Sequence, residues 1–213
     1  MATISEKDKE TIKKKFEEIK NSVKLINFTQ QIECEYCENT RKIMEEISKL
    51  SDKISLEIYN FQLDKQKAEE YKIDKIPATV IFGLKDYGIR YYGIPTGYEF
   101  TSLIEDIIDV SKGESGLSQE TIDKLNQIQK DVHLQVFVTP TCPYCPNAVR
   151  LAHKFAIANY RITADMVEAI EFPHLSVKYN VRGVPKTIIN EEHSVEGAVP
   201  ENILLEKILE AVK

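Results

Sequence analysis

The chain has 213 residues, of which 42% are hydrophobic and 29% are charged, a composition typical of one or two globular domains. Its formal net charge of −6 argues against nucleic acid as the main partner, because phosphate binding requires a basic surface. No apolar run approaches the roughly 18 residues of a transmembrane helix, and the charged N-terminus lacks the apolar core of a signal peptide, so we expect a cytoplasmic protein without a membrane partner.

The first half of the chain predicts alternating helices and strands. In chain order we expect a helix at 5–20, a strand at 23–28, a helix beginning at Cys34 and Cys37, a strand at 54–61, a short helix before Pro77, two strands joined by a turn, and a helix at 97–110. A strand, helix and strand at this spacing indicate a parallel crossover. Residues 96–99 have the sequence of a capping box, which would begin the last helix.

The second half repeats this order after a Ser/Gly-rich stretch at 111–116, the clearest linker signal in the chain. We therefore predict two domains, 1–116 and 117–213. The expected elements are a helix at 118–130, a strand at 132–138, a helix beginning at the second cysteine pair, a strand at 165–172, a proline-led strand pair and a helix at 200–212. Because 108 residues separate both Cys34 from Cys142 and Pro77 from Pro185, the two halves look like copies of one unit.

All four cysteines occur as Cys-x-x-Cys pairs, Cys34/Cys37 and Cys142/Cys145. At the start of a helix, free backbone N–H groups and the helix dipole lower the pKa of the first thiol and prepare it for disulfide exchange. A shared zinc site is disfavoured, because zinc ribbons separate their pairs by roughly 15–20 residues and these pairs belong to different repeats. The alternative of an unreactive, purely structural disulfide is also disfavoured, since the short loop that each pair would close removes little conformational entropy from the unfolded chain.

Two prolines stand at matched positions, each 40 residues after the second cysteine of its half. We expect the Ile76–Pro77 and Val184–Pro185 bonds to be cis. The residue before each proline would then offer its backbone N–H and C=O to an extended peptide, which makes Ile76, Pro77, Val184 and Pro185 the predicted substrate-binding residues. The alternative is an ordinary proline on an edge strand.

Cys142-Pro143-Tyr144-Cys145 is the glutaredoxin-type active-site sequence, and the doubled arrangement resembles the two-domain, glutaredoxin-like protein disulfide oxidoreductases of thermophiles, which are related to protein disulfide isomerase. The resemblance covers essentially the whole chain. It implies an α/β protein with two tandem thioredoxin folds, each a central mixed sheet flanked by helices.

The resemblance also implies an activity. The four cysteines would reduce, form or isomerise disulfides in protein substrates, without a bound cofactor or metal, as part of cell redox homeostasis. A thioredoxin-reductase-like flavoprotein would recharge them. The second half is similar, too, to the N-terminal module of the alkyl hydroperoxide reductase flavoprotein, so an electron carrier between a flavoprotein and a peroxiredoxin is one alternative. A non-enzymatic peptide-binding module is another.

The chain departs from thioredoxin in its proton acceptor. Thioredoxin has a buried aspartate in the strand before its cysteines, and residues 27–28 and 136–137 supply none here. Glu57 or Glu168, on the second strand of each half, is a candidate for this role, against the alternative of an exposed carboxylate. The four histidines show no catalytic or ligand spacing, and we interpret them as structural or surface residues.

The two pairs should not be equivalent. Glu33, Glu35 and Glu38 surround the first pair, and negative charge disfavours a thiolate. The second pair has no acid within four residues on either side, so we predict a lower pKa for Cys142 and a more oxidising C-terminal site. The helix at 148–158 is rich in apolar residues on all sides, which predicts packing against the other domain or another subunit, unless it only fills a crowded core.

Overall fold

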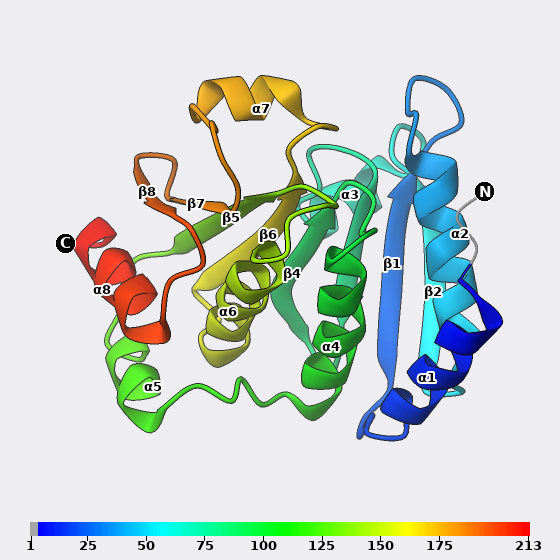
Figure 1. Ribbon diagram of the computed structural model, residues 1–213, viewed down its shortest axis with the longest axis horizontal. Helices are drawn as coiled ribbons and strands as arrows, with labels where there is room; N and C mark the ends of the chain where they lie inside the picture. The colour runs from blue at the N-terminus through cyan, green and yellow to red at the C-terminus, as the bar shows by residue number, and fades with distance from the viewer. Residues whose placement is uncertain (1–3) are drawn as a thin grey trace.

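Eight strands form one mixed sheet in the computed structural model, which describes residues 4–213 (Figure 1). The first half contributes α1 (Glu6–Phe16), β1 (Val23–Thr29), α2 (Cys37–Ser48), β2 (Ile54–Asn60), α3 (Lys65–Glu70), β3 (Ala78–Phe82), β4 (Asp86–Tyr92) and α4 (Glu99–Lys112). The second half contributes α5 (Gln119–Leu125), β5 (Val132–Val138), α6 (Cys145–Ala158), β6 (Ile162–Glu168), α7 (Pro173–Lys178), β7 (Lys186–Ile189), β8 (His193–Glu196) and α8 (Glu201–Ala211).

The predicted order of elements is confirmed, and one strand is displaced. A strand was expected at 165–172, and β6 spans Ile162–Glu168 instead. The chain turns after Glu168, because its carboxylate accepts the backbone N–H of Glu171 at 2.7 Å and Pro173 then begins α7. No helix within residues 4–213 is long and apolar enough to cross a membrane.

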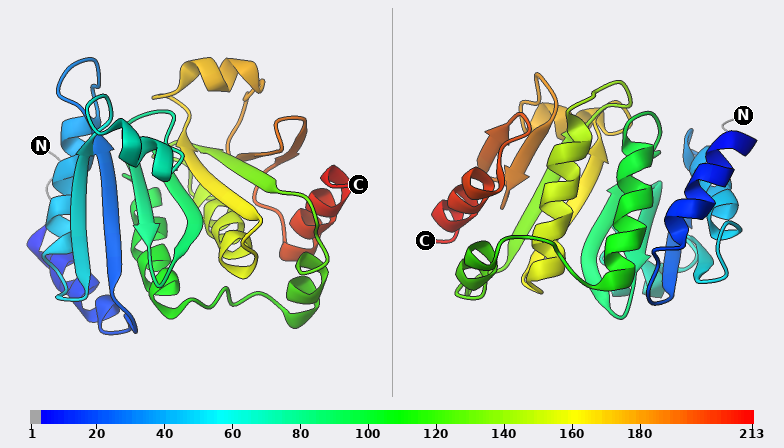
Figure 2. Two further views of the ribbon diagram at one scale, coloured as in Figure 1. Left: turned by 180° about the vertical axis from the view of Figure 1, so that it is seen from behind. Right: turned by 60° about the horizontal axis from the view of Figure 1, so that its bottom comes forward.

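The sheet has the strand order β2-β1-β3-β4-β6-β5-β7-β8. In each half the first two strands are parallel to each other and the last two are antiparallel to each other, as expected. The sequence did not predict the seam between the halves. There β4 pairs with β6 in parallel, with Ile89–Tyr92 in register with Ala164–Val167, so the two four-stranded sheets become one (Figure 2).

Helices cover both faces of this sheet, with α2, α4 and α6 on one and α3 and α7 on the other (Figures 1 and 2). Successive residues of β1 supply the two cores in turn: Leu25 packs under the first layer of helices, and Ile26 and Phe28 pack under the second. Each core contains residues of both halves, so the two halves share continuous hydrophobic cores on both faces of the sheet.

Helix α6 packs beside α4, which confirms the prediction that this helix packs against the other half of the chain (Figure 1). The expectation that α6 is apolar on every side is wrong. Arg150 reaches across to α4, where it donates to Asp106 and, at 2.7 Å, to Asp109. His153 is fully buried and also bonds Asp106. This polar network is tolerated here because the buried charges of Arg150 and Asp106 pair with each other.

Candidate active site at one edge of the sheet

Both cysteine pairs lie at the same edge of the sheet, the upper one in Figure 1, which we call the cysteine edge. Strands β1, β2, β4, β6 and β5 run in the same direction and all end there. Cys34 follows β1 and Cys142 follows β5. Strands β3 and β7 run the opposite way and begin at this edge, so Pro77 and Pro185 lie there as well.

The cysteines of each pair are joined in a disulfide, with Cα atoms 5.4 Å apart in Cys34–Cys37 and 5.5 Å apart in Cys142–Cys145. The second cysteine is the first residue of α2 or α6 and has no exposed surface. The first cysteine is more accessible in both pairs: Cys34 is half-buried and Cys142 is 8% exposed. The backbone N–H of Cys145 donates to the sulfur of Cys142 at 3.1 Å. Each pair therefore has an outer sulfur and an inner sulfur.

The Ile76–Pro77 and Val184–Pro185 bonds are both cis, as the sequence predicts. Each proline loop is tied to the end of the following hairpin in the same way. The Pro77 carbonyl accepts the Gly93 N–H at 2.9 Å, and the Pro185 carbonyl accepts the Gly197 N–H at 2.8 Å. The structure thus brings the predicted residues of each half together at neighbouring strand ends. A role in substrate binding stays a prediction.

Glu99 is a buried acid that the sequence analysis missed. Its side chain is 2% exposed, and neither carboxylate oxygen has a hydrogen-bond partner among residues 4–213. Burial raises the pKa of Glu99 to about 7. The capping box predicted at 96–99 is wrong, because the side chain of Glu99 makes no capping bond and points into the interior.

The start of α4 lies directly against the loop that leads to Cys142. The N–H of Tyr98 donates to the carbonyl of Pro140 at 3.1 Å. Gly97 has φ of 61°, and a Cβ atom there would lie 2.0 Å from the same oxygen, so only glycine allows this contact. The residue before Glu99 in the N-terminal half therefore contacts the loop that leads to the C-terminal cysteine pair.

The two glutamates proposed from sequence as proton acceptors differ sharply. Glu57 is partly exposed and bonds Lys24 at 2.6 Å, which lowers the pKa of its carboxyl, as expected for a solvated ion pair. Glu168 is 3% exposed, and burial raises its pKa. Only Glu168 therefore has the environment of a buried proton acceptor.

Glu168 has a neighbour, Glu171, that the sequence did not single out. Burial raises the pKa of Glu171 to about 7, and its carboxylate accepts the N–H of Ile94 at 2.6 Å, in the loop after β4. The pKa of Tyr36, which stands between Cys34 and Cys37, is raised first by Glu35 and also by Glu171 and Glu168. These carboxyls of the C-terminal half therefore lie near the side chain of Tyr36, within the first cysteine motif.

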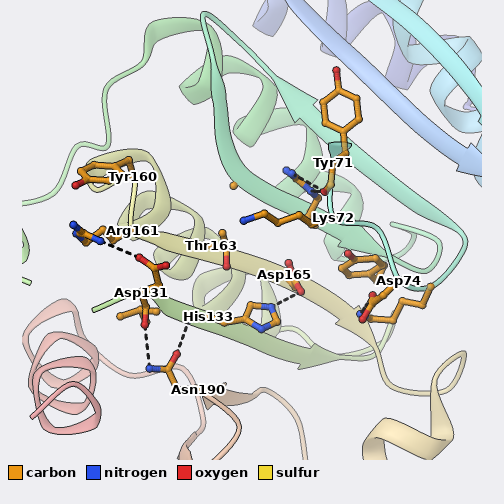
Figure 3. A pocket seen from close by; sticks show the side chains of 15 residues that line it. Tyr71, Lys72, Asp74, Asp131, His133, Tyr160, Arg161, Thr163, Asp165 and Asn190 are labelled. Atoms are coloured by element: carbon orange, nitrogen blue, oxygen red, sulfur yellow. Dashed lines mark hydrogen bonds and ion pairs between the residues drawn. The ribbon is translucent and has the colours of Figure 1, made fainter. Parts of the chain in front are cut away.

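A separate cleft of about 650 Å³ spans the seam on the face that carries α3 and α7 (Figure 3). His133 points at Asp165 within it, at 2.6 Å; burial opposes the charge of His133, but Asp165 raises its pKa. Lys75 pairs with Asp74, and Arg161 with Asp131. No cysteine lines this cleft, and no group of His, Cys, Asp and Glu within residues 4–213 could hold a metal ion. We continue to interpret the four histidines as structural or surface residues.

Comparison with known proteins supports the geometry. A family model described as a thioredoxin domain matches residues 132–210. The structure is similar to a protein disulfide oxidoreductase from Aeropyrum pernix, with 31% sequence identity, a TM-score of 0.93, and coverage of 100% of this chain and 95% of that one. It is also similar to the alkylhydroperoxide reductase AhpF from Enterococcus faecalis, with 25% identity, a TM-score of 0.88 and 99% coverage of both chains.

The chain also matches curated sequences. It is 27% identical over 169 residues to the alkyl hydroperoxide reductase AhpF of Staphylococcus aureus, which is 79% of this chain. The chain spans about a third of the length of the curated relatives it matches, 30% and 31% of the first two.

Proposed function

Because the chain belongs to the two-domain, thioredoxin-fold protein disulfide oxidoreductases, we propose that Cys34/Cys37 and Cys142/Cys145 are its two catalytic pairs. It is a thioredoxin-like disulfide oxidoreductase, and its substrates are disulfides and dithiols of other proteins. One observation carries the assignment of the cysteines. In both halves a disulfide at the start of a helix joins a second cysteine with no exposed surface to a first cysteine that is less buried, beside a proline loop.

Reduction at the C-terminal pair proceeds in two exchanges. The Cys142 thiolate attacks one sulfur of a substrate disulfide, which forms a mixed disulfide and releases the other substrate sulfur as a thiolate. The Cys145 thiolate then attacks the sulfur of Cys142, which forms Cys142–Cys145 and releases the reduced substrate. The reverse sequence forms a disulfide in the substrate. The N–H of Cys145 donates to the Cys142 sulfur and stabilises its thiolate.

Glu99 is our proposed proton acceptor for Cys145. A buried thiol attacks only after it loses its proton, and Cys145 has no exposed surface from which water could take it. Tyr98, the residue before Glu99, contacts the loop that leads to Cys142, and a carboxyl with a pKa of about 7 accepts and returns a proton near neutral pH. Each half would thus complete the chemistry of the other, since Glu168 and Glu171 lie near Tyr36 in the first cysteine motif.

The remaining assignments follow from position and similarity. Ile76, Pro77, Val184 and Pro185 would hold the substrate backbone beside each disulfide. A thioredoxin-reductase-like flavoprotein in the cytoplasm would reduce the pairs, without a cofactor bound to this chain; the similarity to the alkyl hydroperoxide reductase AhpF supports such a partner. Residues 1–116 and 117–213 would be the two domains, and their boundary falls between α4 and α5.

Insulin reduction tests the assignment of the cysteines. We expect Cys142→Ser to remove most of the activity, Cys34→Ser to remove less, and the double variant to be inactive, with circular dichroism unchanged in each. Refolding of a protein with scrambled disulfides then tests isomerisation. A double variant that still reduces insulin would contradict the proposal.

The electron-carrier alternative is favoured by one observation, the match to the alkyl hydroperoxide reductase AhpF over 79% of the chain. The two functions are separated by mixing the prereduced protein with an oxidised peroxiredoxin or with insulin, under the same conditions. A general oxidoreductase reduces both. A dedicated carrier reduces the peroxiredoxin orders of magnitude faster and leaves insulin oxidised.

A further inference from the structure

The two cysteine pairs stand in surroundings of different charge at matched positions. Shifting the first half by 108 residues superposes the two sequences around the pairs. Three acids of the first site then correspond to uncharged residues of the second: Glu33 to Thr141, Glu35 to Pro143 and Glu38 to Pro146. In the proline loops Asp74, three residues before Pro77, corresponds to Arg182, three residues before Pro185, while Lys75 corresponds to the uncharged Gly183.

The acids of the first site are open to an incoming protein. Glu33, Glu35, Glu38 and Asp74 are all exposed. Glu38 bonds Lys42 at 2.5 Å, and Asp74 bonds Lys75 at 2.6 Å, so these two charges are partly balanced. Glu33 and Glu35 have no ion pair within residues 4–213. They therefore leave two uncompensated negative charges on either side of Cys34.

Two buried carboxyls of the other half lie near this site. Glu168 has one oxygen without a hydrogen-bond partner in the described part of the chain, and so has Glu171. Both act on the pKa of Tyr36, within the first cysteine motif. Acidic side chains of both halves therefore lie near the first cysteine motif, in segments that the seam between β4 and β6 joins.

The second site has the opposite character. Arg182 is exposed, its guanidinium donates only to the uncharged amide of Asn180, at 3.0 Å, and no acid within residues 4–213 pairs with it. Residues 138–149 contain no acid. A substrate at Cys142 therefore meets uncharged side chains next to the disulfide and a free cation at the proline loop.

We propose that the two sites divide protein substrates by charge. The Cys34/Cys37 site takes disulfides whose cysteines are flanked by lysine or arginine, and the Cys142/Cys145 site takes those with neutral or acidic flanks. Glu33, Glu35 and Arg182 are the specificity-determining residues. This proposal rests on the proposed function, since it concerns which substrates reach each catalytic pair.

The physical basis is the attraction of charges at short range. A pair of unit charges about 4 Å apart changes a rate by about fivefold even in water. Two carboxylates beside Cys34 should therefore favour a lysine-flanked over a glutamate-flanked cysteine by about tenfold or more. The effect acts over about 30 Å at about 0.01 M salt and over about 3 Å at about 1 M, so it should disappear at high salt.

Two short synthetic peptides test the proposal. They are identical except that lysine flanks the single cysteine in one and glutamate in the other, and each cysteine is a mixed disulfide with thionitrobenzoate. The prereduced protein pair loses two electrons to this disulfide, becoming oxidised while the peptide thiol and coloured thionitrobenzoate are released. The double variant Cys142→Ser/Cys145→Ser reports on the first site, and Cys34→Ser/Cys37→Ser on the second.

The measured quantity is the ratio of the two peptides' rate constants at one site. This ratio cancels the intrinsic reactivity of the thiol, because enzyme, leaving group and pH are the same in both reactions. At low salt we expect a ratio of about ten in favour of lysine at the first site and a ratio of one or less at the second. Glu33→Gln/Glu35→Gln should lower the first ratio toward one, and Arg182→Gln should raise the second.

A matched control removes two charges elsewhere. Glu120→Gln/Glu206→Gln, on α5 and α8 away from the cysteine edge, should leave both ratios unchanged. Conversely, Thr141→Glu/Pro143→Glu should give the second site the preference of the first. Equal ratios at the two sites, or a lysine preference that survives Glu33→Gln/Glu35→Gln, would overturn the charge proposal while leaving the oxidoreductase function intact. Failure of both sites to release thionitrobenzoate would overturn both.

Discussion

At the scale of single residues, Cys34 and Cys142 hold equivalent positions but meet different charges. The Cys142 sulfur receives the N–H of Cys145 at the start of α6, whereas Glu33 and Glu35 flank Cys34. We predict that the pKa of Cys142 lies below that of Cys34 by on the order of one unit. Thiolate ultraviolet absorbance against pH, in variants that keep one pair each, measures both values. A lower pKa at Cys34 would reverse the predicted order of oxidising strength.

Glu99 gives a second prediction at this scale. Its pKa of about 7 in the folded protein exceeds the ordinary value of 4.5, so the folded state binds the extra proton and stability falls as pH rises from about 4.5 to about 7. Glu99→Gln removes that dependence. Relative to the wild type, we expect the variant to gain stability over this pH range, by on the order of 3 kcal/mol in total. Urea unfolding at several pH values measures the difference.

The control for Glu99 is Glu206→Gln, an exposed glutamate on α8. Its stability should follow the wild type at every pH. The same Glu99→Gln preparation also tests the proton-acceptor role, since insulin reduction by the Cys142/Cys145 pair should slow at neutral pH although the variant is more stable. Unchanged kinetics would leave Glu99 a buried acid with no part in the reaction.

At the scale of elements, the contact between α4 and α6 depends on Asp106. It is fully buried and bonds Arg150, His153 and the hydroxyl of Tyr91. Burial alone would raise the pKa of Asp106, but His153 and Arg150 lower it below the ordinary value. The carboxylate therefore contributes stability that is present above its unfolded pKa and is lost as pH falls through the folded one.

Asp106→Asn should cost on the order of 3 kcal/mol, because it leaves the charge of Arg150 half-paired in the interior. The matched control is Asp109→Asn, one turn further along α4, where the carboxylate also pairs with Arg150 but is partly exposed and should cost less than about 1 kcal/mol. Urea unfolding at neutral pH compares them. Equal losses in the two variants would show that burial of Asp106 is not what matters.

At the scale of the whole molecule, the seam makes the two halves one cooperative unit. Four residue pairs join β4 to β6, and the core under α2, α4 and α6 is continuous across the boundary. We predict a single unfolding transition. In hydrogen exchange followed by mass spectrometry, β1 and β5 should share the same free energy of opening. Separate transitions would mean that the halves unfold as independent domains.

The sequence was sufficient for whatever is local or repeated. The cysteine pairs, the cis-prolines and the order of helices and strands follow from motif spacing and hydrophobic periodicity, which are properties of a short stretch of chain. The error at the start of α4 arose because a distant segment intervened. The pattern at 96–99 suggested a cap, but packing against Pro140 turned Glu99 inward.

Only the tertiary structure decided how the halves meet and which carboxyls are buried. The apolar residues of β4 and β6 indicate strands but do not identify their partners, so the seam between them was invisible in the sequence. The elevated pKa values of Glu99 and Glu171 and the lowered one of Asp106 have the same origin. A side chain's loss of water and its neighbouring charges are set by segments far away in the chain, and they exist only once the chain has folded.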